Sequence, residues 1–181
     1  MALAPMRVRA ARDDDGMSLR EIERRAGDRF RDVGLSAIAD DEPASVQELA
    51  RYADSGRSWV AVDGTGIPIG YVLVDEVDGN AHVEQMSVEP SHQGRGVGRA
   101  LLERVGEWAV ATGCPALTLT TYAGVPWNAP LYEHLGFRVM GAHEVGPELA
   151  AVRVAEKAAG LDIAERVCMR WDVARGVIEV T

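Results

Sequence analysis

Residues 88–99 read VEPSHQGRGVGR, and this stretch decides the fold. It links an apolar run that ends at Val88 to a segment from Val97 onward, in which Leu101 and Trp108 lie on one helical stripe. The glycines between them let the backbone turn so that successive N–H groups point outward at the start of the helix. The stretch therefore predicts a strand, a tight turn and a helix whose N-terminus suits an anion such as a pyrophosphate.

The elements on either side of this stretch predict a mixed sheet. After the helix ends at Gly113, residues 116–122 form a buried apolar run, so strand, turn, helix and strand make a β-α-β unit with two parallel strands. Before it, residues 58–62, 67–74 and 81–88 are apolar runs separated by turn signals, which predicts an antiparallel meander. The sheet is therefore expected to be mostly antiparallel, with a parallel pair at its centre.

Further strands and helices are expected toward both ends of the chain. Ser18 with Glu21 and Ser45 with Glu48 are capping boxes that predict two helix starts. Residues 31–43 between these helices are expected to be an irregular connection, of the kind that often lines a substrate entrance. The remaining predicted elements are strands at 6–10, 137–140 and 167–173, a short helix after Asn128 and a helix at 147–159.

Length and composition are typical of one soluble domain. We expect a single domain over residues 1–181, with a core of about residues 6–173 and a short C-terminal tail. The sequence has neither an apolar stretch long enough to span a membrane nor a signal-peptide pattern, so a cytoplasmic protein is expected. The predicted fold class is α+β, of the α/β/α type, with helices flanking a twisted mixed sheet.

Charge, cysteines and histidines argue against several classes of function. The chain has 19 basic and 28 acidic residues, a net charge of −9 that opposes a phosphate backbone, so nucleic acid is not expected as a partner. Cys114 and Cys168 form no C-x-x-C pair, and His92, His134 and His143 lack metal-ligand spacing. We therefore expect buried structural thiols, no metal and no covalent nucleophile.

The glycine-rich stretch resembles a known signature. The pattern Q-x-x-G-x-G at residues 93–98, after a strand that ends in Val88-Glu89-Pro90, is similar to the acetyl-CoA motif of the GNAT superfamily of N-acetyltransferases. Residues 131–137, LYEHLGF, are similar to the second conserved segment of that family, and the order of elements agrees from about Met6 to Trp171. The patterns of a P-loop and of a dinucleotide-binding fingerprint are not met.

This resemblance implies a coenzyme A site. In the family the glycine-rich turn holds the CoA pyrophosphate through backbone N–H groups, and the pantetheine arm pairs with main-chain groups of the preceding strand. Carried over, the site comprises Met86, Ser87 and Val88 of the strand and Gln93, Gly94, Arg95, Gly96, Val97, Gly98 and Arg99 of the turn. Arg95 and Arg99 stand where the helix dipole disfavours a cation, which favours an anionic ligand. The alternative is a flexible glycine turn with two surface arginines.

Two residues are candidates for the chemistry. An amine like that of Lys has a pKa of about 10.4, so a general base is useful. Glu84 is unusual as an acid within an apolar strand, and by period 2 it is expected to share a face with His82, Met86 and Val88. The resemblance places a base on this strand and, at Tyr132, a tyrosine that gives the departing thiolate a proton or hydrogen bond. A surface carboxylate and a core tyrosine are the alternatives.

A backbone N–H near Met86, freed from the ladder by a bulge, would stabilise the oxyanion. The chain departs from the family pattern at Val125, where the family's asparagine tends to lie, and Asn128 stands one turn closer to Tyr132. Asn128 either reaches the cofactor or only caps the short helix. The candidates for an aromatic wall around the substrate, which are otherwise core residues, are Phe30, Tyr122 and Trp127.

The sequence therefore predicts an N-acetyltransferase that moves an acetyl group from acetyl-CoA to a primary amine by direct attack in a ternary complex. The alternatives are a non-catalytic module that binds or senses acyl-CoA and an N-acyltransferase that uses another acyl-CoA. The acceptor, a small-molecule amine or a protein or peptide amine, stays open because fold alone does not choose among them. The final strand is expected to allow a homodimer by pairing across a two-fold axis, and no membrane partner is expected.

Overall fold

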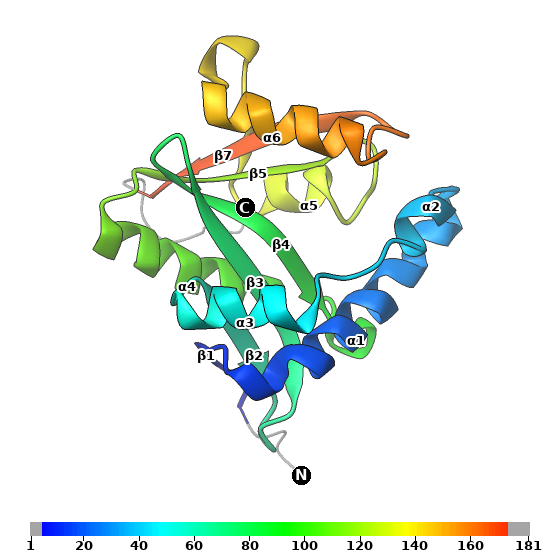
Figure 1. Ribbon diagram of the computed structural model, residues 1–181, viewed down its shortest axis with the longest axis vertical. Coiled ribbons are helices and arrows are strands. Elements are labelled where there is room, and N and C mark those ends of the chain that lie inside the picture. The colour runs from blue at the N-terminus through cyan, green and yellow to red at the C-terminus, as the bar shows by residue number, and fades with distance from the viewer. Residues whose placement is uncertain (1–4, 174–181) are drawn as a thin grey trace. The chain divides into compact units, whose positions relative to one another are not determined.

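The computed structural model describes residues 5–173 and confirms a mixed, mostly antiparallel sheet with flanking helices (Figure 1). The strands follow the order β1-β2-β3-β4-β5-β7-β6. Their bounds are β1 Arg7–Ala10, β2 Ser58–Val62, β3 Pro68–Val77, β4 Asn80–Val88, β5 Ala116–Tyr122, β6 Arg138–Val139 and β7 Arg166–Asp172. The helices are α1 Gly16–Gly27, α2 Ser36–Ala39, α3 Val46–Asp54, α4 Val97–Thr112, α5 Ala129–His134 and α6 Pro147–Ala158, with 3-10 turns η1 Asp13–Asp15, η2 Asp28–Val33, η3 Pro90–His92 and η4 Ala142–Glu144.

The chain divides into two compact units. The first consists of the residues up to Val74 together with Gln85–Arg104, and the second of Asp75–Glu84 together with the residues from Val105 onward. The division falls within β3 and α4 and between Glu84 and Gln85 of β4, so these three elements contribute residues to both units. That the chain is a single domain stays a prediction.

The first unit has an apolar core between two helices and two strands. Figure 1 shows α1 and α3 on the same side of β2 and β3. Burying an apolar side chain of this size stabilises the fold by about 1.5–3 kcal/mol. Tyr71 is the polar member of the core, so its hydroxyl needs a partner. The core side chains are Leu19 and Ile22 of α1, Leu49 of α3, Val60 and Val62 of β2, and Tyr71 and Leu73 of β3.

The start of α4 covers the other face of β3. A Cβ added to Gly70 would lie 3.0 Å from Cγ1 of Val97 and 3.0 Å from the carbonyl oxygen of Ser87. A Cβ added to Gly98 would lie 3.5 Å from Cε of Met86. The N-terminus of α4 therefore packs closely against the end of β4, and this contact fixes both ends of the turn that joins them.

In the second unit, β4 and β5 form the predicted parallel pair. Ala81 pairs with Leu117, and His82 pairs with Thr118. β5 pairs with β7 in antiparallel fashion along its whole length. β6 pairs with the other side of β7, at Met169 and Arg170.

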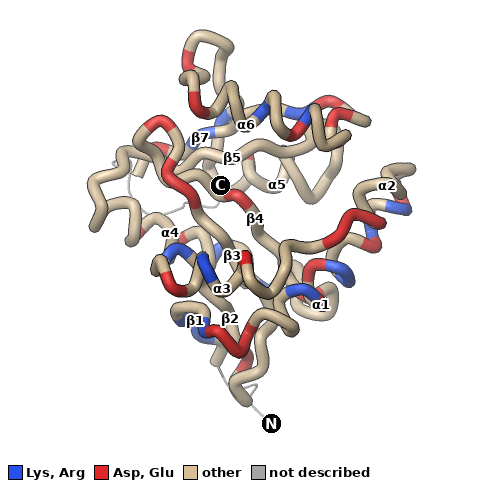
Figure 2. Tube along the Cα trace, in the orientation of Figure 1, with Lys and Arg blue, Asp and Glu red and all other residues tan. Residues whose placement is uncertain are grey.

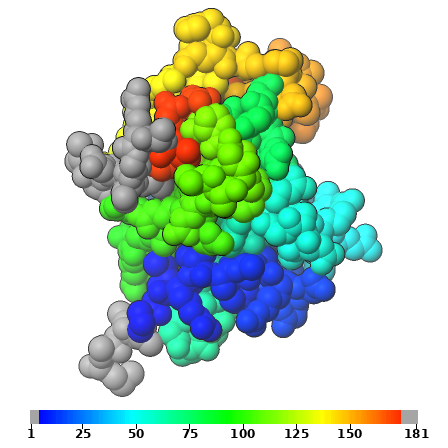
Figure 3. Space-filling model, turned by 90° about the vertical axis from the view of Figure 1, so that its left-hand side faces the viewer, coloured from blue at the N-terminus to red at the C-terminus, as the bar shows by residue number. Residues whose placement is uncertain are grey.

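Two contacts hold the helices of the second unit to its strands. A Cβ added to Gly106 of α4 would lie 3.3 Å from the ring of Trp171, and in Figure 3 the red surface of β7 lies beside the green surface of the end of α4. Asp78, in the turn between β3 and β4, accepts hydrogen bonds from the N–H groups of Glu148 at 3.0 Å and Leu149 at 2.9 Å. Because these are first-turn donors of α6, the turn caps that helix.

Most predicted elements are confirmed, among them the strand at 116–122 and the helix from Val97. The second capping box is also confirmed, since Oγ of Ser45 accepts from the N–H of Glu48 at 3.2 Å. The first box is wrong, because α1 already begins at Gly16, two residues before Ser18. The predicted irregular connection at 31–43 is wrong in part, because it contains the end of η2 and the whole of α2.

The final strand is not the edge of the sheet. β7 lies between β5 and β6, so pairing of an open last strand across a two-fold axis is wrong as a route to a homodimer. The predicted C-terminal tail lies outside the described residues. Between residues 5 and 173, no helix is both long and apolar enough to cross a membrane, and no cluster of three His, Cys, Asp or Glu side chains is arranged to hold a metal.

Candidate active site

The turn between β4 and α4 presents backbone groups at a helix N-terminus. Gly94 and Gly96 have φ angles of +71° and +81°, which glycine adopts without strain, and a Cβ added at either would meet no atom within 4 Å. The N–H of Ala100 donates to the carbonyl of Gly96 at 3.0 Å. The preceding N–H groups, of residues 97–99, have no acceptor within the helix by its geometry. Open glycines followed by such donors fit a pyrophosphate.

The side chain of Gln93 is turned back toward the protein. Its Nε2 donates to the carbonyl of Val88 at 3.0 Å, and its Oε1 accepts from Nη1 of Arg29 at 2.6 Å. Its own N–H donates to the carbonyl of Pro90 at 3.3 Å. Gln93 therefore closes the turn, which corrects the expectation that its N–H binds the pyrophosphate. A carbonyl oxygen has two lone pairs, so the Val88 carbonyl can accept a further hydrogen bond, such as one from a cofactor arm.

Arginines of α1 and η2 alternate with acidic residues in the first unit (Figure 2). Arg25 donates to both carboxylate oxygens of Glu89, just before the turn, at 2.8–3.0 Å. On α4, Nε of Arg99 lies 2.9 Å from Oε1 of Glu103, whereas Arg95 is exposed. Glu103 therefore offsets part of the unfavourable interaction between Arg99 and the positive end of the α4 dipole. From the sequence alone, an anionic ligand was expected to offset it.

Glu84 lies in an acidic neighbourhood of the second unit. Its residue is exposed, yet partial burial of the carboxyl and the nearby carboxylates of Asp75 and Glu156 raise its pKa, while Arg166 lowers it. Glu156 is held in place by hydrogen bonds from Thr120 and, at 3.0 Å, from Nη2 of Arg166. A carboxylate with a raised pKa is a stronger base, so this environment suits proton acceptance.

The side chain of His82 faces away from α4. Its Nδ1 lies 3.0 Å from Oγ1 of Thr118 on β5. The neighbour of Thr118, Leu117, pairs with Trp171, which is the residue that packs against α4. Since consecutive strand residues face opposite sides, Thr118 and His82 lie on the face opposite α4.

Met86 and Val88, in contrast, face α4, where they contact Gly98. A regular strand would place His82 and Met86 on one face because they are four residues apart. The alternation of β4 therefore changes phase between them. Asp75 and Glu156 lie near both Glu84 and His82, so Glu84 lies on the His82 side of the strand. The prediction that Glu84 shares a face with Met86 and Val88 is therefore wrong.

Tyr132 lies on α5. Its ring packs edge-on against Phe137, with centroids 5.6 Å apart and an interplanar angle of 67°. Burial raises the pKa of Tyr132 to about 12. The phenol is therefore protonated at neutral pH and can donate a hydrogen bond.

Asn128 precedes α5, but its side chain makes no cap hydrogen bond, so the predicted cap is wrong. Its Oδ1 is buried and accepts no hydrogen bond from the described part of the chain. Leaving a buried amide oxygen without a donor costs about 1–3 kcal/mol. Asn128 therefore fits the other predicted role, in which a ligand N–H supplies the donor.

The three aromatic candidates differ in their surroundings. Tyr122 is 3% exposed, its hydroxyl donates to the carbonyl of Leu161 at 2.9 Å, and Arg166 lies over its ring at 4.6 Å. These contacts give Tyr122 a structural role. The prediction that Tyr122 belongs to an aromatic wall around the substrate is therefore wrong. Phe30 in η2 and Trp127 before α5 are partly exposed.

A buried polar pair in the first unit was missed from the sequence. The hydroxyl of Tyr71 on β3 donates to the carboxylate of Glu23 on α1. The available signal was the position of Glu23, which lies beside Ile22 and four residues after Leu19 on the apolar stripe of α1. An acid at such a position needs a buried partner.

Comparison with protein families identifies the chain. The model described as Acetyltransferase (GNAT) family matches residues 19–137, well over half of the sequence. This chain belongs to the GNAT family of acetyltransferases. The matched span contains the β4–α4 turn, Glu84 and Tyr132. The family is one of acetyltransferases, and a solved structural neighbour contains its cofactor acetyl-CoA.

Two curated relatives and one solved structure are similar to this GNAT chain. Human N-acetylaspartate synthetase is 39% identical over 102 residues, 56% of this chain and 34% of that protein, so the chain spans about a third of its length. Peptidyl-lysine N-acetyltransferase YjaB of Salmonella typhimurium is 27% identical over 139 residues, 76% of this chain and 87% of that protein. The structure of Rv2747 from Mycobacterium tuberculosis in complex with CoA and NLQ has a TM-score of 0.69 at 18% identity, covering 92% and 98% of the two chains, and supports the fold.

Proposed function

We propose that this GNAT chain transfers an acetyl group from acetyl-CoA to a primary amine by direct attack within a ternary complex. The observation that carries the proposal is the β4–α4 turn, where Gly94 and Gly96 are open and precede the first-turn N–H groups of a helix. The N–H groups of residues 97–99 would hold the pyrophosphate. When bound, acetyl-CoA supplies the acetyl group as a thioester.

Backbone and side-chain groups would hold the cofactor arm. The main chain of Met86 and Val88 would pair with it as an added strand would. Asn128 would accept a hydrogen bond from an amide N–H, which satisfies its buried Oδ1. The phase change in β4 supports the idea that the N–H of Met86 is free to stabilise the oxyanion.

Glu84 and Tyr132 would handle the protons of the reaction. Glu84 accepts a proton from the acceptor's ammonium group, which leaves a neutral amine for attack and a neutral carboxyl. Its raised pKa reduces the mismatch with the amine. Tyr132 donates a hydrogen bond to the departing thiolate, a role that its protonated phenol supports.

The charges around Glu84 favour a cationic acceptor. Glu84 and Asp75 attract an ammonium group and repel a carboxylate, whereas ion pairs with Arg153 and Arg166 balance the charge of Glu156. A lysine side chain, the acceptor type in the name of YjaB, therefore suits this chain better than aspartate, the acceptor type in the name of the synthetase.

The test is a screen of amines with acetyl-CoA, followed by thiol release. It includes a peptide with one lysine and a blocked N-terminus, and L-aspartate. We expect release with the lysine peptide. Faster release with L-aspartate would overturn the acceptor class. If the chain binds CoA but no amine of the panel leads to thiol release from acetyl-CoA, the result would instead indicate a non-catalytic binding module.

A further inference from the structure

Two arginine contacts hold the end of α1 and the following η2 turn against the start of the β4–α4 turn. Arg25 donates to the carboxylate of Glu89 at 2.8–3.0 Å, and Nη1 of Arg29 donates to Oε1 of Gln93 at 2.6 Å. Glu89 and Gln93 flank η3, and each contact joins residues 64 positions apart. All four residues belong to the first unit. The end of α1 and η2 therefore lie along this turn.

The two contacts differ in how strongly they can hold the turn. Arg25 and Glu89 form a surface ion pair, in which the Arg25 side chain is 49% exposed, so water screens the pair and it contributes little. Arg29 and Gln93 are both partly buried, and a hydrogen bond with an ionised donor is about twice as strong as a neutral one. Burial lowers the pKa of Arg29 and the nearby Asp32 raises it. The contact to Gln93 is therefore expected to stabilise the turn more.

Arg29 fixes which way the amide of Gln93 points. A guanidinium group has N–H donors and no acceptor, so it requires the oxygen end of the amide. The NH₂ end then faces the Val88 carbonyl, to which Nε2 donates at 3.0 Å. A flipped amide would place NH₂ against the guanidinium and its oxygen against the carbonyl, and both contacts would be repulsive. The bond from Gln93 to Val88, which closes the chain between them, thus depends on Arg29.

The residues that follow need such an anchor. Gly94 and Gly96 are exposed, and a Cβ added to either would meet no atom within 4 Å. Glycine also loses more conformational freedom on folding than any other residue. Because Gln93 immediately precedes Gly94, its two side-chain hydrogen bonds anchor the backbone where the flexible stretch begins.

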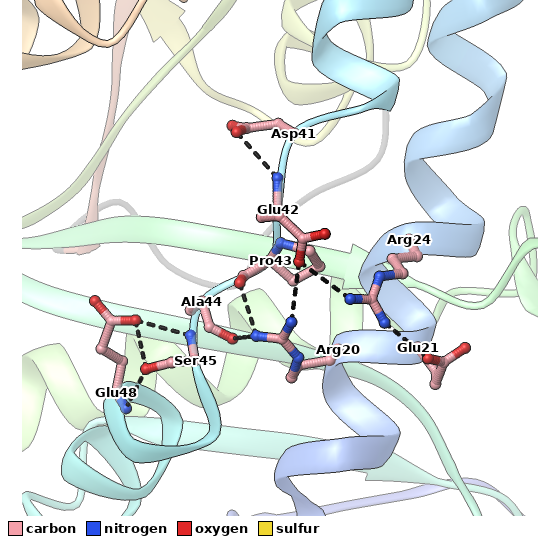
Figure 4. Close-up of polar contacts among 9 residues, drawn as sticks. All are labelled: Arg20, Glu21, Arg24, Asp41, Glu42, Pro43, Ala44, Ser45 and Glu48. Atoms are coloured by element: carbon pink, nitrogen blue, oxygen red, sulfur yellow. Dashed lines mark hydrogen bonds and ion pairs between the residues drawn. The ribbon is translucent and has the colours of Figure 1, made fainter.

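Arg29 extends from a part of the first unit that is itself held in place. η2 follows α1 directly, and α1 packs into the core of this unit. Arg20 and Arg24 of α1 both donate to Glu42, in the segment that leads into α3 (Figure 4). Groups on packed elements hold their geometry better than groups on loops. The guanidinium of Arg29 is therefore a fixed point for the turn, whereas Arg20 and Arg24 contact a different segment.

We propose that Arg29 is a positioning residue of the cofactor site, which holds the β4–α4 turn in the conformation that grips the diphosphate of coenzyme A by fixing the amide of Gln93. The inference rests on the proposed function, in which the N–H groups of residues 97–99 hold that diphosphate. Without the guanidinium the amide can rotate, and its bond to Val88 weakens. Part of the binding free energy then goes into ordering the turn, so coenzyme A binds more weakly.

The test is calorimetric titration of the full chain with CoA. Arg29→Met, which keeps an unbranched side chain but no donor, is expected to weaken CoA binding about tenfold, the size of one hydrogen bond to a charged group. Gln93→Ala is expected to weaken it by a similar factor, and the double variant no further, because both act on one contact. Arg29→Lys, which keeps a donor for Oε1, should restore most of the affinity. The matched control is Arg24→Ala, which removes hydrogen bonds to Glu21 and Glu42 from the same helix and should leave CoA affinity unchanged.

A second readout needs no cofactor. The side-chain NH₂ signals of Gln93 in a ¹⁵N–¹H spectrum should move toward those of a free amide in Arg29→Met and stay near wild type in Arg24→Ala. In turnover with the lysine peptide, Arg29→Met should raise KM for acetyl-CoA and leave kcat nearly unchanged. Should Arg29→Met fail to fold, Arg29→Ala takes its place with the same expectations.

Three results would overturn the inference: unchanged CoA affinity in Arg29→Met, additive losses in the double variant, or a larger loss in Arg25→Ala than in Arg29→Met. The last result would show that the ion pair to Glu89 holds the turn. A wild-type chain that binds CoA but acetylates no amine would contradict only the proposed transfer, whereas one that binds no CoA would overturn both proposals.

Discussion

Glu23 in the first unit and Glu84 in the second are both carboxyls whose pKa is raised mainly by burial, but their neighbours differ. Glu23 accepts a hydrogen bond from the buried phenol of Tyr71. Its charged neighbours are Asp41, Arg20 and Arg24. Glu84 is exposed as a residue although its carboxyl is partly buried, and its charged neighbours are the carboxylates of Asp75 and Glu156 and the guanidinium of Arg166, which pairs with Glu156. A raised pKa alone therefore does not identify a base. A carboxyl locked by a hydrogen bond suits positioning, whereas one among like charges suits proton transfer.

The largest expected effect is that of Glu84→Gln. The amide cannot accept a proton, so kcat with the lysine peptide should fall about a hundredfold or more. In the wild type, activity should fall as pH falls through the raised pKa of Glu84, because the protonated form is inactive as a base, and this acid limb should vanish in the variant. Steady-state pH profiles check both expectations. The exposed Glu76 of β3 offers the control Glu76→Gln, and a loss of similar size there would undo the contrast with Glu84.

Tyr132→Phe should have the next largest effect. Loss of one hydrogen bond to the leaving thiolate should lower kcat about tenfold to a hundredfold and leave KM for acetyl-CoA nearly unchanged. Because the pKa of Tyr132 is about 12, the wild type should show no alkaline loss of activity from this group up to about pH 10. An equal change in KM would mean that Tyr132 binds the cofactor rather than assisting its departure.

Two glycines, Gly96 in the β4–α4 turn and Gly98 in the first turn of α4, separate the effect of backbone conformation from that of packing. Gly96→Ala forces a side chain onto a φ of +81°, which costs about 1–2 kcal/mol, so acetyl-CoA should bind roughly tenfold more weakly. Gly98→Ala adds a Cβ at ordinary contact distance from Met86, so its effect should be within about threefold. Calorimetric titration with CoA measures both. Equal losses of CoA affinity in the two variants would show that the space around these positions, and not their backbone conformation, explains the need for glycine.

These contrasts also show which features the sequence can reveal. The β4–α4 turn was predictable because its glycines, strand and helix are contiguous, and local spacing dictates local structure. The Glu23–Tyr71 bond was not, because it joins residues 48 positions apart on a helix and a strand. The phase change in β4 was missed although the sequence carries a local signal of it, since Val83 and Met86 are three residues apart with the adjacent polar residues Glu84 and Gln85 between them. Gln93 was assigned to the correct turn but to the wrong atom, because its closing hydrogen bonds depend on Arg29 and Val88.

The smallest expected effect concerns stability and contrasts Glu23 with Asp15. Burial raises the pKa of Asp15, but the hydrogen bonds from Arg9 and from the N–H of Arg12 lower it by more, so the net shift is downward. The folded state thus binds fewer protons at Asp15 than the unfolded chain, and its stabilisation is present at pH 7 and lost as pH falls below about 4. Glu23 has the opposite sign, since its folded pKa is raised and its ionisation lowers stability as pH rises above about 4.5.

Relative to wild type, Asp15→Asn should therefore be least stable at pH 7 and recover toward pH 3.5, whereas Glu23→Gln should gain relative stability from pH 4 to pH 7. Each unit of pKa shift corresponds to about 1.4 kcal/mol, which urea unfolding at several pH values resolves. Parallel pH dependences in the two variants would contradict the assigned environments, because only opposite shifts give opposite slopes.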